Sequence, residues 1–271
     1  MALMASDEHS DLSLIEHRAR SVAHLFVDRV AKTPEAEAFR FPRGEDWESV
    51  TWAQTDARVR QIAAGLDALG IELEQRVAIA SSTRYEWVIA DLAVMLAGAA
   101  TTAIYPTTSE SDVTFIMSDS GSRIAFAEND DQIAKLRANR SALPEVIKVV
   151  TFDGTPDGEW VISLADLEQL GTARLAQEPS LVDDRIAAIE AHHLATLIYT
   201  SGTTGRPKGV RLSHDNWTYE AATVDAIGIL NHDDLQYLWL PLAHVLGKVL
   251  LTLPLQVGFP TALDGRRSGD E

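Results

Sequence analysis

Short apolar segments recur at regular intervals along the first part of the chain, and the segments between them have helical periodicity. The apolar segments predict strands at 76–81, 101–105, 123–127 and 146–152, and helices are predicted between them at 86–96, 109–117 and 130–139. Strands that alternate with helices pair in parallel, since each helix returns the chain to the same edge of the sheet. The pattern therefore predicts an α/β fold of doubly wound, mostly parallel sheets with flanking helices.

A further helix before the first strand has clear end signals. Thr51 and Gln54 have the spacing of a capping box, apolar residues follow at helical period, and Gly70 is placed to end the helix. The stretch 153–177 is polar and rich in turn residues, so we predict a surface insertion or a joint between subdomains there.

A second sheet is expected to begin after residue 184. The elements predicted there are a strand at 194–199, a helix at 215–227 capped by Ser213, and a strand at 235–240. We therefore divide the chain into a first α/β subdomain, residues 1–183, and the start of a second, residues 184–271.

The loop after the strand at 194–199 has an unusual composition. Residues 199–210 read YTSGTTGRPKGV, a run of small hydroxyl residues and glycines that ends in a lysine. Glycines expose backbone N–H groups, and Pro207 fixes the backbone just before Lys208. We predict a polyphosphate site, although the same residue types also form ordinary surface turns. The residues expected to bind phosphate are Thr200, Ser201, Gly202, Thr203, Thr204, Gly205 and Lys208.

The loop differs from the phosphate loop of the P-loop NTPases, because Gly209 follows Lys208 where that motif has Ser or Thr. It resembles instead the phosphate loop of the adenylate-forming superfamily, which includes acyl-CoA synthetases, luciferases and peptide-synthetase adenylation domains. A second segment, LPLAHVL at 240–246, resembles a motif of the long-chain acyl-CoA synthetase branch. The resemblance extends over residues 49–265 and includes the order of the elements.

The resemblance implies a reaction in two halves. A carboxylate attacks the α-phosphorus of ATP to give an acyl-adenylate and pyrophosphate, and the thiol of CoA then displaces AMP. Residues 200–204 and Lys208 would hold the β- and γ-phosphates, Mg²⁺ would bridge those phosphates, and Thr204 is the residue assigned to the metal. His244 would orient the carboxylate or gate an acyl tunnel. The alternative for His244 is a partly buried ring that hydrogen-bonds backbone beside Pro241.

Other residues that could carry chemistry have simpler explanations. His192 and His193 are adjacent, so their side chains diverge, and His214 lies at a helix start where its backbone environment matters more than its ring. We expect packing roles for Trp52, Trp87, Trp217 and Trp239. Residues on one helical face could line an acyl tunnel but more often form plain core: Leu246, Val249, Leu250 and Leu253.

Composition limits the partners of the protein. A formal net charge of −17 argues against binding nucleic acid or anionic membranes. It also repels ATP and CoA, so a nucleotide site needs the local cations Arg206, Lys208 and Arg211. The chain has no cysteine, which excludes disulfides and a thiolate metal site.

The sequence shows no signal peptide and no convincing membrane span. The apolar stretches 87–105 and 238–260 are interrupted by Asp91 and by prolines, His244 and Lys248. We predict a soluble, cytoplasmic protein, with at most peripheral membrane contact if the substrate is a fatty acid.

Several parts of the family pattern are missing from the 271 residues. These are the Tyr-Gly-x-Thr-Glu motif, the hinge, and the C-terminal lid domain with its lysine. Ser268-Gly269-Asp270 resembles a ribose-binding motif by chance, and 266–271 looks like an unrelated tail. We therefore expect an incomplete copy with a poorly active site, an exposed strand edge and an exposed apolar face at 250–257. A separate polypeptide could complete it.

Three functions remain open from the sequence. The first is ATP-dependent activation of a long-chain fatty acid to acyl-CoA. The second is a non-catalytic remnant that binds a nucleotide or an acyl group. The third is another acid-activating, adenylate-forming enzyme, which the LPLAHV segment argues against.

Overall fold

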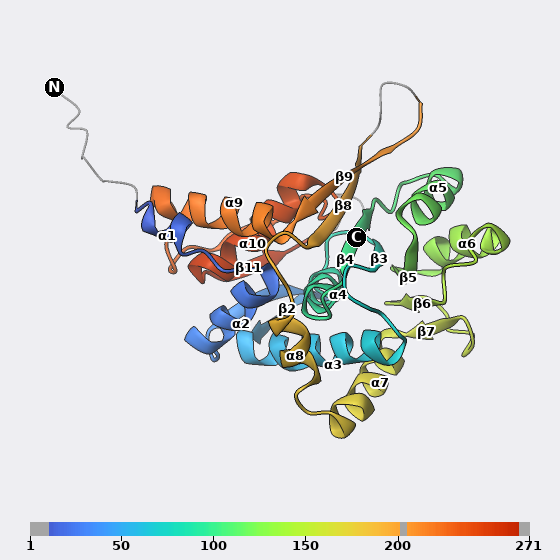
Figure 1. Cartoon of the computed structure of the whole chain (residues 1–271), viewed down its shortest axis with the longest axis horizontal. Helices are drawn as coiled ribbons and strands as arrows, with labels where there is room; N and C mark the ends of the chain where they lie inside the picture. Colours follow the sequence, from blue (N-terminus) through green and yellow to red (C-terminus); the bar gives the residue numbers. More distant parts are fainter. Residues whose placement is uncertain (1–10, 201–204, 266–271) are drawn as a thin grey trace.

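Seven strands form the larger of two sheets in the computed structural model, which describes residues 11–200 and 205–265 (Figure 1). Their spatial order is β7-β6-β5-β3-β4-β8-β9, and neighbours pair in parallel except for the antiparallel pair of β8 and β9. The strands are β3 (Arg76–Ala80), β4 (Ala100–Ile104), β5 (Ser122–Ala127), β6 (Lys148–Thr151), β7 (Val161–Ser163), β8 (Leu194–Thr200) and β9 (Lys208–Ser213).

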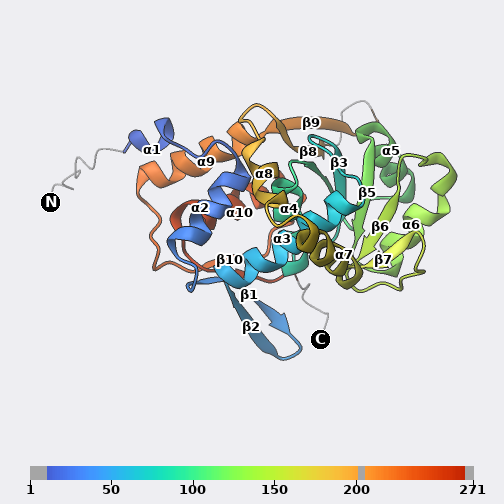
Figure 2. The ribbon, with the colours of Figure 1, turned by 60° about the horizontal axis from the view of Figure 1, so that its bottom comes forward.

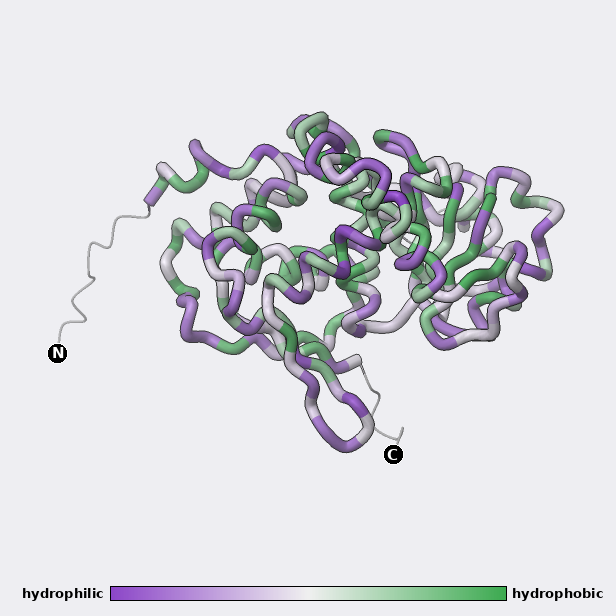
Figure 3. Tube along the Cα trace, turned by 90° about the horizontal axis from the view of Figure 1, so that it is seen from below, coloured by the Kyte–Doolittle hydropathy of each residue, from purple (hydrophilic) through white to green (hydrophobic). Residues whose placement is uncertain are grey.

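The smaller sheet joins the beginning of the described chain to its end. Its order is β10-β11-β1-β2, with β1 and β2 antiparallel and the other neighbours parallel. The strands are β1 (Glu37–Arg43), β2 (Asp46–Thr51), β10 (Gln236–Leu238) and β11 (Thr261–Leu263). The β1–β2 hairpin protrudes from the molecule, and its tip is hydrophilic (Figures 2 and 3).

Helices cover both faces of the larger sheet because alternate residues of its strands face opposite sides. Ala78 and Ala80 of β3 pack with α5 and α6, whereas Val77 and Ile79 belong to the core that contains α3, α4 and α7 (Figure 2). The helices are α1 (Ser13–Glu16), α2 (Val22–Lys32), α3 (Trp52–Ala68), α4 (Tyr85–Leu96), α5 (Glu110–Ser120), α6 (Asp130–Ala138), α7 (Leu164–Gln177), α8 (Leu181–Ala187), α9 (His214–Ile227) and α10 (Val245–Val257), with a 3₁₀ turn at Arg140–Ala142.

Helix α3 shows how local sequence sets these elements. The Thr51 side chain accepts from the Gln54 backbone, and the Gln54 side chain accepts from the Thr51 backbone, which completes the predicted capping box. The chain leaves the helix through Gly70, whose φ of +85° favours glycine. The predicted mixed α/β fold, with parallel strands and flanking helices, is confirmed.

Two sequence expectations about the second half are wrong. The strand at 194–200 does not begin a second sheet, because β8 pairs with β4 inside the larger one. The segment 250–257 does not expose an apolar face, because it lies in α10 with Leu251, Leu253 and Leu255 buried. The boundary between residues 183 and 184 as a division into subdomains stays a prediction.

The stretch 153–177 is also more ordered than its composition predicted. It contains β7 and the whole of α7, which starts with a capping box between Ser163 and Asp166. Helix α7 approaches α3 so closely that a Cβ at Gly171 would lie 1.7 Å from the Gln61 carbonyl oxygen. Because most residues of this stretch are polar, its composition did not reveal the buried face of α7, which includes Leu164 and Leu167.

Candidate functional site

A pocket of about 770 Å³, which we name the β4–β8 pocket, lies where β4 and β8 end side by side. Ligands of doubly wound sheets bind at this carboxyl edge. The pocket combines apolar walls with a few polar groups, and its lining comes from the ends of β4 and β8, from α5 and β9, and from the start of α10. Its lining residues are Ala103, Ile104, Tyr105, Thr107, Thr108, Ser109, Asp112, Ile116, Ile198, Tyr199, Thr200, Pro207, Val210, Leu212, His244 and Val245.

One wall of the pocket belongs to the β8–β9 arm, by which we mean Tyr199 and Thr200 with residues 205–211. This ribbon extends past the rest of the sheet beside α5 (Figure 1). Thr200 pairs with Lys208, and Tyr199 with Gly209. Thr200 and Pro207 line the pocket, whereas Lys208 is not one of the lining residues. The predicted phosphate ligands Ser201, Gly202, Thr203 and Thr204, the last also assigned to the metal, lie outside the described residues.

Two contacts hold the β8–β9 arm against α5. The Tyr199 hydroxyl donates to the Asp119 carboxylate at 2.7 Å, and the Arg206 guanidinium lies 5.4 Å from the centre of the Phe115 ring. Burial raises the pKa of Tyr199, and the hydrogen bond to the carboxylate raises it further. The Tyr199 ring also lies over Gly209, where a Cβ would come within 3.0 Å of it. The base of the arm is therefore fixed by packing.

The cations of the β8–β9 arm face solvent. Lys208 and Arg211 are exposed, and so is Gly205. Among the residues that the structure describes, neither the Lys208 ammonium nor the Arg211 guanidinium has a hydrogen bond or an ion pair. An unpaired cation keeps its charge available for an anion, which suits Lys208 for a phosphate.

His244 lines the pocket at the start of α10. It is the N-cap of α10, where its Nδ1 accepts from the Leu246 N–H at 3.2 Å. Its own backbone N–H donates to the Pro241 carbonyl at 3.0 Å. In the neutral ring the proton then sits on Nε2, which is a donor. His244 is exposed rather than partly buried, so it bonds backbone and lines the pocket at once.

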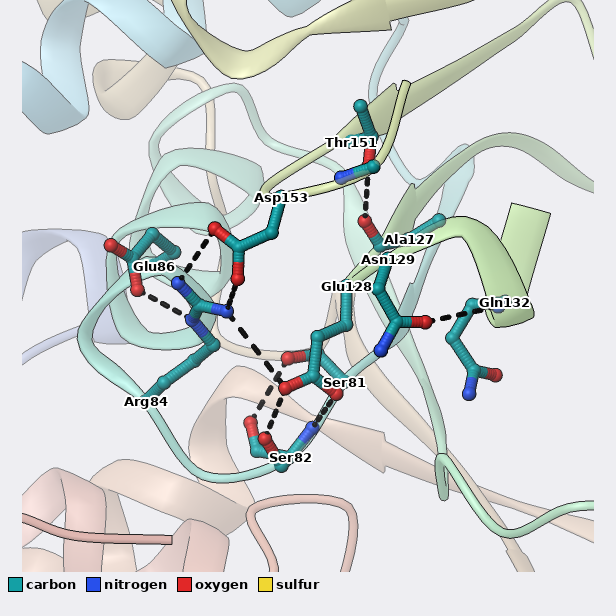
Figure 4. Close-up of polar contacts among 11 residues, drawn as sticks. Ser81, Ser82, Arg84, Glu86, Ala127, Glu128, Asn129, Gln132, Thr151 and Asp153 are labelled. Carbon is teal, nitrogen blue, oxygen red and sulfur yellow. Dashed lines mark hydrogen bonds and ion pairs between the residues drawn. The ribbon is translucent and has the colours of Figure 1, made fainter. Parts of the chain in front are cut away.

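A network of ion pairs holds the neighbouring strand ends (Figure 4). Arg84, at the start of α4, lies within ion-pair distance of Glu86, Glu128 and Asp153. Burial alone would lower the pKa of Arg84, but hydrogen bonds to Asp153 and Glu86 outweigh it and raise the pKa. The Ser82 N–H and hydroxyl donate to Glu128. This network fixes the loop from β3 to α4 and engages the Arg84 cation internally.

The remaining residues that the sequence singled out have structural surroundings. His214 is buried, and its Nδ1 accepts from the Val22 N–H at 3.3 Å. Burial lowers its pKa to about 3, with a smaller contribution from the Lys248 charge. Of the four tryptophans expected to pack in the core or at its rim, Trp52, Trp87 and Trp217 are buried, whereas Trp239 is 61% exposed and lies outside the core.

Sequence reasoning did not assign a role to Asp91 and Lys248, which form a buried ion pair between α4 and α10. The signal was present, since each charge interrupts an otherwise apolar stretch. It also missed Asp119, which no motif marks.

The described part of the chain lacks a cluster of metal ligands and a helix that could cross a membrane. No group of three or more His, Cys, Asp or Glu side chains there is arranged to hold a metal ion. Across residues 11–200 and 205–265, none of the helices has the length and apolar character that a membrane crossing requires.

Known proteins similar to this chain are ligases. The Long-chain-fatty-acid–CoA ligase FadD15 of Mycobacterium bovis is 37% identical over 206 residues, which are 75% of this chain and 33% of that ligase. The rat Long-chain-fatty-acid–CoA ligase ACSBG2 is 30% identical over 250 residues, 89% of this chain and 37% of the ligase. The chain thus spans about a third of the length of these relatives.

A solved structure shares the fold. The long-chain-fatty-acid-CoA ligase FadD1 of Archaeoglobus fulgidus matches with a TM-score of 0.79 at 19% identity, over 93% of this chain and 48% of that one. A family model described as "AMP-binding enzyme" matches residues 26–267. The resemblance read from the phosphate loop and the LPLAHV segment is confirmed, and the chain belongs to the family of AMP-binding enzymes.

Proposed function

We propose that this chain supplies the phosphate-binding and acyl-binding part of an AMP-forming long-chain fatty acid–CoA ligase. The observation that supports the proposal most is the joint contribution of two distant motifs to one pocket. Thr200 and Pro207 from the phosphate loop line the β4–β8 pocket together with His244 from the LPLAHV segment. The relatives named as long-chain-fatty-acid–CoA ligases support the same substrate class.

The β8–β9 arm is proposed to hold the phosphates of ATP. Thr200 and Lys208 face each other across the two strands, and an exposed ammonium without an ion pair can pair with phosphate oxygens. Such groups stabilise the charge that develops on the leaving pyrophosphate. Residues 201–204 and Gly205 stay proposed phosphate contacts. Mg²⁺, which binds ATP through phosphate oxygens, is proposed to contact Thr204.

The apolar side of the β4–β8 pocket is proposed to take the fatty acid. Ile116, Ile198 and Val245 provide apolar walls, while the Nε2–H of His244 is proposed to donate to the carboxylate. The ring would thereby orient the carboxylate for attack on the α-phosphorus. CoA is the proposed second substrate, whose thiol would displace AMP.

The proposals about the rest of the fold, the location of the protein and its partners are based on the family and on composition. The complete reaction is proposed for this chain together with the remainder of the fold that the relatives contain, on the same or a separate polypeptide. We propose a cytoplasmic protein, divided into subdomains at residues 183 and 184, with at most peripheral membrane contact. No role in nucleic-acid binding is proposed, given the net charge of −17.

The test is exchange of labelled pyrophosphate into ATP by the purified chain, with and without palmitate and Mg²⁺. We expect palmitate-dependent exchange at a low rate, which Lys208→Ala abolishes and Lys32→Ala preserves, because Lys32 is also an exposed lysine but lies on α2, outside the β8–β9 arm. Nucleotide or palmitate binding without exchange would identify a binding remnant. Exchange driven by aryl or amino acids instead of palmitate would contradict the substrate class.

A second pair of variants tests His244 separately. His244→Asn keeps a side-chain acceptor for the Leu246 N–H, whereas His244→Ala removes both the cap and the ring. If the imidazole orients the carboxylate, both variants weaken palmitate binding. If only the cap matters, the asparagine variant binds palmitate like the unchanged chain.

A further inference from the structure

A fully buried ion pair lies between α4 and α10, outside the lining of the β4–β8 pocket. Lys248 of α10 and Asp91 of α4 have side chains that are 3% and 2% exposed. The second carboxylate oxygen of Asp91 accepts from the Thr101 hydroxyl at 2.7 Å. The Lys248 ammonium lies 5.5 Å and 5.8 Å from the ring centres of Trp87 and Trp217. We name these five residues the pocket floor.

The pocket floor is connected to three of the elements that form the pocket: β4, β8 and α10. Thr101 belongs to β4 and stands beside Thr196 of β8 in the sheet register. Thr196 accepts a hydrogen bond at 3.1 Å from the Trp217 indole, one of the rings around Lys248. Lys248 itself lies one helical turn after His244, and its N–H donates to the His244 carbonyl at 3.0 Å. Strands β4 and β8 are thus tied to the start of α10.

A buried ion pair is a poor source of stability but a strict geometric constraint. Removing both charges from water costs free energy, and a well-packed apolar pair often serves stability equally well. Burial lowers the pKa of Lys248, and the Asp91 carboxylate opposes this effect. Each Asp91 oxygen has one donor, so a displacement of α10 along α4 would leave a charge buried and unpaired.

We propose that Lys248 and Asp91 are positioning residues of the β4–β8 pocket. The pair fixes α10 against α4 and β4, and thereby holds His244 at the ends of β4 and β8. This inference rests on the proposed function for its consequence in ligand binding, but the placement of the His244 ring is a property of the free protein. Neither residue touches the ligand, since both lie outside the lining of the pocket.

The test replaces both charges with apolar residues of similar size, in the double variant Asp91→Leu with Lys248→Met. Three quantities are compared with the unchanged chain: the melting temperature, the ¹⁵N and ¹³C signals of the His244 ring, and the dissociation constant for palmitate. His244→Asn identifies the His244 signals in the spectrum. The matched control is Leu251→Ala, which removes a buried side chain from the same helix without touching the pair.

We expect the double variant to melt close to the unchanged chain, to shift the His244 signals, and to bind palmitate at least about tenfold more weakly, roughly 1.4 kcal/mol. Leu251→Ala should melt lower but keep the His244 signals and the affinity. A double variant with unchanged His244 signals would overturn the proposal. If the unchanged chain binds no palmitate, the proposed function fails, and the His244 signals still decide the positioning role.

A milder variant covers the case in which the double variant does not fold. Thr101→Val removes one donor to Asp91 and keeps the shape of the side chain. It should shift the same His244 signals by a smaller amount. Unchanged His244 signals in folded Thr101→Val, when the double variant cannot be folded, would equally overturn the proposal.

Discussion

The pocket floor and the β8–β9 arm are both connected to strand β8 beside the β4–β8 pocket, but they differ in burial and in how their charges are paired. Lys248 is enclosed, with a carboxylate and two aromatic rings around it. Lys208 is exposed, and its ammonium has no ion pair within the described residues. A lysine therefore fixes the packing of two helices in the pocket floor, whereas a lysine of the arm is accessible to a ligand.

This difference separates two kinds of mutational effect. A change that leaves one charged or polar group of the pocket floor buried without its partner should lower the free energy of unfolding. A change in the exposed β8–β9 arm should leave that free energy nearly unchanged and act on binding. Variants that fail to follow this division would show that the two regions are not distinct.

The largest effect is expected from breaking the buried pair on one side only. Lys248→Met leaves the Asp91 carboxylate buried without its cation, which should lower the free energy of unfolding by roughly 3–5 kcal/mol. Urea denaturation followed by tryptophan fluorescence measures the change. The double variant with Asp91→Leu should recover most of it. A loss below about 1 kcal/mol in the single variant would mean that the charges are not truly enclosed.

The next effect is a pH dependence that arises beside the pocket floor. Burial lowers the pKa of His214 to about 3, from 6.5 in the unfolded chain. Between pH 6.5 and pH 3, His214 is therefore protonated in the unfolded chain but neutral in the folded chain. The contribution of His214 to stability is present above pH 6.5 and is lost as pH falls toward 3. Between pH 7 and pH 5 the loss is about 2 kcal/mol.

The control for this pH dependence is His214→Asn, which keeps an acceptor for the Val22 N–H but does not titrate. Urea denaturation at pH 7 and at pH 5 should show a drop in stability for the unchanged chain that exceeds the drop in the variant by that amount. Equal drops in both proteins would show that His214 is accessible to protons in the folded state.

A smaller effect is expected where the arm joins the body of the protein. Tyr199→Phe removes the hydroxyl that donates to Asp119 and keeps the ring over Gly209. The expected loss is about 1 kcal/mol of unfolding free energy. Nucleotide affinity should fall as well, because the variant loosens the strand end that carries Thr200. Asp119→Asn, which keeps an acceptor, is the matched variant. If nucleotide affinity stays unchanged in Tyr199→Phe, the hydrogen bond between Tyr199 and Asp119 is not needed for nucleotide binding by the arm.

The smallest effect on stability is expected at Lys208 itself. Lys208→Ala should change the free energy of unfolding by less than about 0.5 kcal/mol, since its ammonium is solvated and unpaired among the described residues. Urea denaturation checks this value against Arg211→Ala. A loss above about 1 kcal/mol would mean that Lys208 has a structural role, and the contrast with Lys248 would disappear.

The sequence predicted those parts of the fold that local patterns determine. The capping box at Thr51, the N-cap at Ser213, and the strands β3 to β6 follow from side-chain period and end signals. The pairing of β1 with β11, from opposite ends of the described chain, has no local signal. The membership of β8 in the larger sheet is equally non-local, which explains why the sheet boundary was misplaced.

The candidate site divides in the same way. Thr200, Lys208 and His244 were predicted because they belong to recognisable motifs, and the structure describes all three. Asp91, Lys248 and Asp119 act through partners far away along the chain, so no spacing in the sequence connects them. Their charges within apolar stretches marked the first two as unusual, but only the fold shows which residues they meet.

The central claim, that the exposed arm binds a nucleotide's phosphates, is tested most directly by calorimetric titration of the purified chain with ATP and Mg²⁺. We expect binding that Lys208→Ala weakens at least about tenfold, roughly 1.4 kcal/mol, while Lys32→Ala, which removes an exposed lysine of α2, binds like the unchanged chain. Absence of binding in the folded chain, or equal affinity in all three proteins, would contradict the assignment of this loop to phosphate.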